Sequence, residues 1–157
     1  MAYKYSKTDN DNIGWFKKDM TKGTLLGIQL SEGKLRGLNP FSIDLQYPIT
    51  VFAGKNCSGK STLLALASCA YHNVSGGFKL PSKKTNYYTF SDFFIQSKEE
   101  IPPQGIKIRY KILYDNWRPS KNLPEGKGIG AQVRIKKTGG KWNEYSARVK
   151  RNVVFLG

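Results

Sequence analysis

The sequence predicts an α/β fold in which a core of central parallel strands with one flanking helix is joined to an antiparallel β-subdomain. Two observations indicate the core: a short β-branched run at residues 49–53 ends at a glycine-rich stretch, and a helical pattern follows at residues 61–71. The subdomain is indicated by residues 106–114 and 131–137, where apolar and polar side chains alternate as in strands with one solvated face.

The expected core occupies residues 24–77, and its strands come first. The apolar run at residues 25–30 predicts a strand. Residues 41–45 alternate with a period of two, which predicts a half-buried strand. Residues 49–53 are mostly β-branched and end at glycine, which predicts a fully buried strand of a parallel sheet. The helix expected at residues 61–71 contains neither Pro nor Gly.

The expected β-rich region occupies residues 78–157. Residues 87–90 fit a strand, and residues 91–95 fit either a short helix or a second strand. The most regular antiparallel strand is predicted at 106–114, with Ile and Tyr on one face and Lys and Arg on the other. A loop at 116–128 and a hairpin at 131–145 follow.

Both ends of the chain differ from the regions between them. Residues 1–23 are polar, and we expect a frayed or loosely docked lead-in there. Residues 153–157 form an apolar run that predicts another buried strand, with no helix after it to cover it. We therefore expect the chain to be a truncated segment of a longer protein.

Composition and charge narrow the classes of function. The 157 residues fit one domain, and no apolar run approaches the roughly 20 residues that span a bilayer. Two cysteines and one histidine provide neither a disulfide framework nor a metal cluster, and we interpret His72 as structural or solvated. A reduced, cytoplasmic location is expected, since the start of the chain has no apolar secretory region.

The basic charge is concentrated in the second half of the chain. The formal net charge is +15, and residues 101–151 contain thirteen Lys or Arg and three acidic residues. A surface of this kind favours DNA or RNA as a partner. The alternatives are a solubilising face and a surface that a protein partner or further chain neutralises.

Residues 54–61, Gly-Lys-Asn-Cys-Ser-Gly-Lys-Ser, match the phosphate-binding pattern G-x-x-x-x-G-K-[ST] in full. Glycines at both ends allow the backbone to approach phosphates closely, and successive N–H groups then form a nest for anions. The start of the following helix adds unsatisfied N–H groups and the positive end of its dipole. This P-loop predicts binding of a purine nucleoside triphosphate, with ATP and magnesium as the expected ligands.

The side chains of the loop have separate expected roles. Lys60 places a point charge between the β- and γ-phosphates, the Ser61 hydroxyl ligates magnesium, and Thr62 donates to the α-phosphate. Cys57 has no histidine partner nearby in the sequence, so we interpret it as a small loop residue and not as a nucleophile. The expected nucleotide-binding residues are Gly54, Lys55, Asn56, Cys57, Ser58, Gly59, Lys60, Ser61 and Thr62.

Residues 24–73 resemble the N-terminal part of the ABC/SMC/RecF-like ATPases, including the AAA-type, OLD-like members of genome-maintenance and phage-defence systems. The resemblance rests on Leu35-Arg36-Gly37-Leu38, on the strand patterns at 41–45 and 49–53, and on the run from Gly54 to Leu64. It covers about a third of the chain and is specific to the superfamily.

The resemblance implies further site residues and partners. Asn56 matches the loop asparagine of the family, and Arg36 matches an arginine that often lies near the nucleotide. Gln96 is the candidate for the glutamine that joins magnesium and the attacking water. The basic strands at 106–150 look like the antiparallel subdomain beside the nucleotide, and self-association is implied because two heads of the family enclose ATP between them. Cys57 departs from the commoner Gly, Ala or Asn.

Two elements of the family are missing from the sequence. No apolar strand ends in an Asp-Glu pair, and no Leu-Ser-Gly-Gly-Gln-like signature is present. Because phosphoryl transfer depends on positioned charge and an oriented water, we expect weak nucleotide binding and little or no hydrolysis. Other readings are a P-loop kinase or GTPase, although an Asn-Lys-x-Asp motif is absent, and a nucleic-acid-binding β module that uses aromatic side chains such as Tyr110, Tyr114, Trp117 and Trp142.

Overall fold

The fold is seen in a computed structural model that describes residues 4–72, 83, 85, 87–94, 105–136 and 149–156. Along the chain, the described elements are helix α1 (Lys7–Lys18), strand β1 (Thr24–Glu32), strand β2 (Phe41–Asp44), helix α2 (Lys60–Ser68), the single-turn helix α3 (Phe90–Phe93), strand β3 (Ile106–Tyr114) and strand β4 (Gly128–Lys136). The protein is therefore α/β, as expected.

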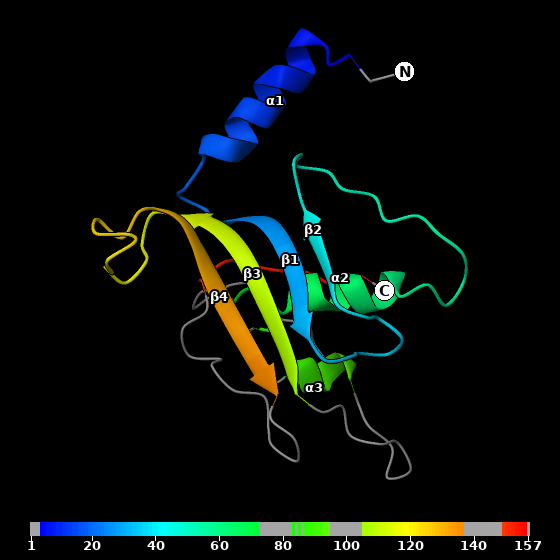
Figure 1. The fold of residues 1–157 in the computed structure, drawn as a ribbon. Coiled ribbons are helices and arrows are strands. Elements are labelled where there is room, and N and C mark those ends of the chain that lie inside the picture. Colours follow the sequence, from blue (N-terminus) through cyan, green and yellow to red (C-terminus); the bar gives the residue numbers. More distant parts are fainter. Residues whose placement is uncertain are drawn as a thin grey trace.

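The strands form one four-stranded antiparallel sheet in the order β2-β1-β3-β4. Figure 1 shows this order from right to left, with α2 and α3 behind the sheet. The expected central parallel strands are not found in the described residues, where the only parallel pairing is an isolated bridge between His72 and Lys150. The sheet instead joins strands from both of the expected regions, because β1 pairs directly with β3.

Burial divides the sheet into a core face and an open face. On β3, Ile106, Ile108, Tyr110 and Ile112 are fully buried, whereas Arg109 and Lys111 between them are exposed. The alternation predicted for this strand is thus confirmed. It arises because α2 packs against one side of the sheet only, so that every second residue faces water.

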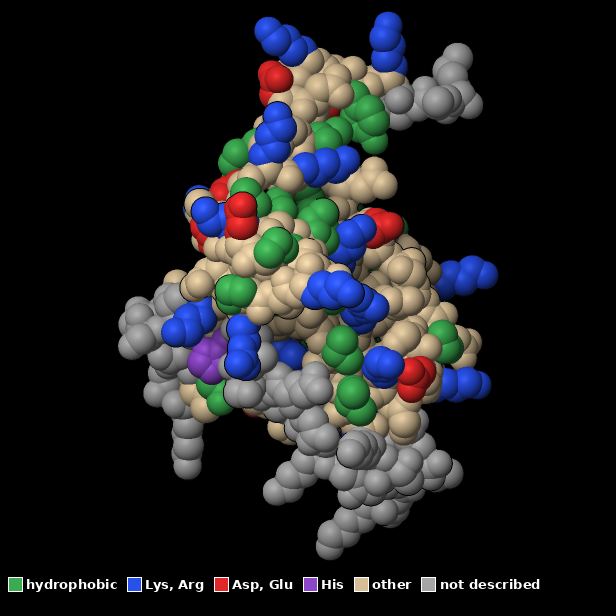
Figure 2. Space-filling view, turned by 60° about the vertical axis from the view of Figure 1, so that its left-hand side comes forward, with side chains coloured by type: hydrophobic (Ala, Val, Ile, Leu, Met, Phe, Trp, Pro, Cys, Tyr) green, Lys and Arg blue, Asp and Glu red, His purple; other side chains and the backbone are tan. Residues whose placement is uncertain are grey.

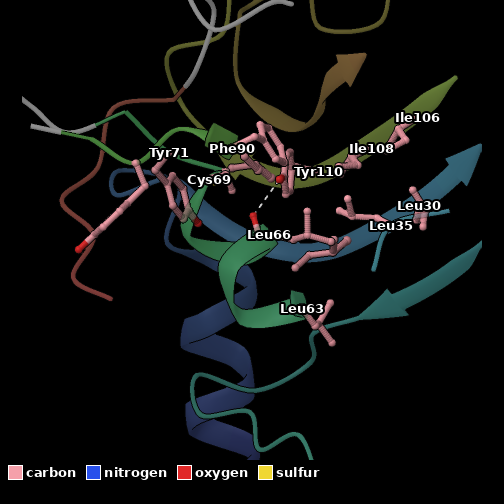
Figure 3. Packing of buried hydrophobic residues seen from close by; sticks show 14 of the residues in the cluster. Leu30, Leu35, Leu63, Leu66, Cys69, Tyr71, Phe90, Ile106, Ile108 and Tyr110 are labelled. Carbon is pink, nitrogen blue, oxygen red and sulfur yellow. Dashed lines mark hydrogen bonds between the residues drawn. The ribbon is translucent and has the colours of Figure 1, made fainter. Parts of the chain in front are cut away.

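The centre of the core lies where α2 meets β1 and β3. Leu63 and Leu66 of α2 and its C-cap residue Cys69 point toward the sheet, and the Tyr110 hydroxyl donates a 2.8 Å hydrogen bond to the Leu66 carbonyl oxygen (Figure 3). Leu66 is fully buried. This bond satisfies a carbonyl near the C-terminal end of the helix and fixes the position of α2 on the sheet.

The core becomes polar toward the edge strand β4. Its core-facing positions are Gly130, Gln132 and Arg134, and Arg134 is 1% exposed. The Arg134 guanidinium donates to the Gln132 side-chain oxygen at 2.6 Å and to the Val133 carbonyl at 2.9 Å. These bonds offset part of the cost of burying a charge.

Helix α1 forms where a polar lead-in was expected. Ser6 caps it, and the Asp9 carboxylate accepts from the Ser6 backbone N–H at 2.9 Å while the Ser6 hydroxyl accepts from the Asp9 N–H at 3.1 Å. This capping box supplies local stability without a buried face. None of its residues is buried, and the helix projects beyond one end of the sheet (Figure 1), so the expected loose docking is observed.

The buried strand predicted at residues 49–53 is wrong. This stretch has no regular structure, Ile49 and Val51 are 75% and 82% exposed, and no backbone hydrogen bond joins it to other described residues. A β-branched run becomes a strand only where a neighbouring strand supplies hydrogen bonds and a packing surface. Among the described residues no strand pairs with this run, so it stays extended and solvated.

Two further strand predictions fail. Residues 87–89 have no regular structure, and α3 follows them, so the helical alternative for residues 91–95 is the one observed up to Phe93. Residues 153–156 form no strand, and Phe155 packs edge-on against Phe93 with ring centroids 4.8 Å apart. The hairpin expected after residue 137, including Trp142, lies outside the described residues.

Tyr71 gives the core a pH dependence. It is 6% exposed, and burial raises the pKa of its hydroxyl from 10.0 to about 12, although the Arg151 guanidinium above the ring acts in the opposite direction. The folded state therefore holds this proton more tightly than the unfolded state does. The resulting stabilisation is complete below pH 10 and is lost as the pH rises through 12.

We expect this group to cost the protein up to about 2–3 kcal/mol of its free energy of unfolding between pH 10 and pH 12. Urea unfolding at a series of alkaline pH values would measure the effect, and Tyr71→Phe provides the control. The difference between the two proteins isolates Tyr71 from the other tyrosines. Parallel pH profiles for both proteins would show that Tyr71 does not titrate differently on folding.

Candidate functional site

The glycine-rich loop of residues 54–59 leads directly into α2, as the P-loop prediction requires. Residues 54–58 are exposed, and Gly59 and Lys60 are half-buried. A Cβ on Gly54 would lie 2.9 Å from the Ser58 hydroxyl oxygen, which shows how closely the loop folds upon itself. Glycine at this position therefore permits the tight loop.

The Lys60 ammonium group lies inside the curve of the loop. It donates to the carbonyl oxygens of Gly54 at 2.9 Å and Lys55 at 2.7 Å. The lysine side chain thus folds back from the first residue of α2 and holds the two ends of the loop together. Because Lys60 is only half-buried, its charge remains accessible to an anion at the loop surface.

Backbone donors gather at the same place. The first helical hydrogen bond of α2 runs from the Leu63 N–H to the Gly59 carbonyl at 2.9 Å. The N–H groups of Lys60, Ser61 and Thr62 have no acceptor among the described residues, and Gly59 provides no side-chain cap. Unsatisfied N–H groups and the positive end of the helix dipole favour an anion at this point.

A short turn supports the loop from behind. Leu35 and Leu38 exchange backbone hydrogen bonds of 3.0 and 2.9 Å, which closes the turn. A Cβ on Gly59 would lie 2.3 Å from Leu38 Cδ2, and Gly59 has a φ of 89°. Sequence reasoning missed Leu38 as a supporting residue, because no spacing rule indicates that it contacts the second glycine of the loop.

Cys57 adopts a left-handed backbone conformation, with a φ of 63°. Side chains with a Cβ are strained there by roughly 1 kcal/mol, whereas glycine is not. The Cys57 side chain is exposed, so burial does not offset this strain. The loop therefore carries local strain next to the backbone that is predicted to bind phosphate.

We expect Cys57→Gly to leave stability unchanged or to raise the free energy of unfolding by up to about 1 kcal/mol, because relief of strain opposes the added entropy of the unfolded chain. Cys57→Val should be destabilising, since a β-branched side chain tolerates this conformation least. Urea unfolding of both variants measures the pair. Equal stability of the Gly and Val variants would show that the loop does not hold residue 57 in this conformation.

The remaining predicted site residues are Arg36, Ser61, Thr62 and Gln96, and the structure does not place all of them at the loop. Arg36 is exposed at the tip of the turn, where its guanidinium lies 5.6 Å from the centre of the Phe94 ring. The turn that contains Arg36 therefore contacts the loop through Leu38, but the Arg36 side chain lies against Phe94 at the end of α3. Ser61 is exposed and Thr62 half-buried at the start of α2. Gln96 lies outside the described residues.

The described residues contain no cluster of three or more His, Cys, Asp or Glu side chains that could hold a metal ion. In the part of the chain that the structure describes, no helix has both the length and the apolar character that a membrane span requires. No protein-family model, curated protein or solved structure matches the chain.

Proposed function

We propose that this chain binds the phosphates of Mg-ATP at residues 54–62 and is the nucleotide-binding segment of an ABC/RecF-like ATPase. The observation that supports this most is the convergence of the Lys60 ammonium with three N–H groups at the start of α2 that have no acceptor among the described residues. A lysine, a tight glycine loop and a free helix start are the parts from which a triphosphate site is built.

Each part has a defined task in this proposal. The N–H groups of Lys60, Ser61 and Thr62 donate to phosphate oxygens, and Lys60 exchanges its loop carbonyl partners for the β- and γ-phosphates. The Ser61 hydroxyl supplies one magnesium ligand. Magnesium, when bound, neutralises charge on the phosphates. Leu38 positions the loop by packing behind Gly59.

In this proposal the chain binds ATP and hydrolyses it slowly or not at all. The sequence contains neither the Asp-Glu strand nor the signature that would orient water and stabilise the transferring phosphoryl group. The family resemblance places the full activity in an ATP-driven switch that acts on DNA or on an effector, in genome maintenance or phage defence. A GTPase is disfavoured because no base-reading Asn-Lys-x-Asp motif is present, and a small-molecule kinase is disfavoured because the arginines follow strand patterns and not an Arg-rich lid.

Displacement of a fluorescent ATP analogue tests the site. We expect ATP to compete far better than AMP, because AMP lacks the β- and γ-phosphates that Lys60 contacts. Magnesium should strengthen ATP binding by the wild-type protein, should do so less for Ser61→Ala, and should do so normally for Ser61→Thr. Equal competition by ATP and AMP would contradict a triphosphate site, and an unchanged magnesium effect in Ser61→Ala would contradict the role of Ser61.

A further inference from the structure

We draw no further inference here: the strongest candidate, the open face of the sheet, exposes the cations Arg109 and Lys111 on β3 beside the Lys and Arg side chains spread over the side of the molecule on which β4 lies (Figure 2), but nothing in the described residues shows what covers it.

Discussion

Leu66→Ala is expected to lower the free energy of unfolding by about 3 kcal/mol, within the 2–5 kcal/mol range of buried leucine truncations. Leu66 is fully buried in α2 where the helix crosses β1 and β3, and its carbonyl accepts the Tyr110 hydroxyl. The variant leaves a cavity that the sheet and helix cannot close without moving this hydrogen bond. Urea unfolding measures the loss.

Leu64→Ala is the matched control for this prediction. It removes the same atoms from the same helix, but Leu64 is 45% exposed. The expected loss is therefore below about 1 kcal/mol. Similar losses at residues 64 and 66 would show that α2 does not pack on the sheet through the face described above.

Gly59→Ala is expected to reduce ATP affinity by at least about ten-fold and the free energy of unfolding by about 1–2 kcal/mol. Its φ of 89° strains any residue with a Cβ, and the added atom would lie 2.3 Å from Leu38 Cδ2. The start of α2 must shift to relieve this contact. Because the backbone N–H donors of Lys60, Ser61 and Thr62 lie in that first turn, the shift should disturb the proposed phosphate site.

Gly37→Ala separates the strain from the contact. Gly37 has a similar φ of 82°, but no atom lies within 4 Å of its added Cβ. Its variant should lose comparable stability and retain its affinity for ATP. If Gly37→Ala lost as much affinity as Gly59→Ala, the effect would come from general destabilisation and not from the loop geometry.

The sequence predicted the elements whose pattern depends on local rules. Strand β3 was predicted because Ile and Tyr alternate with Lys and Arg over its whole length, and packing on one face requires that pattern. The glycine-rich loop and α2 were predicted because both glycines and the lysine have positions set by backbone geometry. Helix α1 could have been predicted from Ser6 and Asp9, whose spacing fits a capping box, but its polar composition hid it.

The arrangement of the strands could not be predicted in the same way. Residues 49–53 have the composition of a buried strand, yet composition does not say whether a neighbouring strand is present. The pairing of β1 with β3 joins residues about 80 positions apart, and neither pattern specifies the other as its partner.

The central claim is that residues 54–62 form a site for Mg-ATP, and calorimetric titration of Mg-ATP into the purified chain tests it most directly. Lys60→Ala is the critical variant. Lys55→Ala is the matched control, because Lys60 contacts the backbone carbonyl oxygen of Lys55, and alanine retains that oxygen while removing an equal charge. The account predicts saturable binding by the wild type and Lys55→Ala and its loss in Lys60→Ala. Absence of binding by the folded wild type, or equal binding by Lys60→Ala, would contradict it.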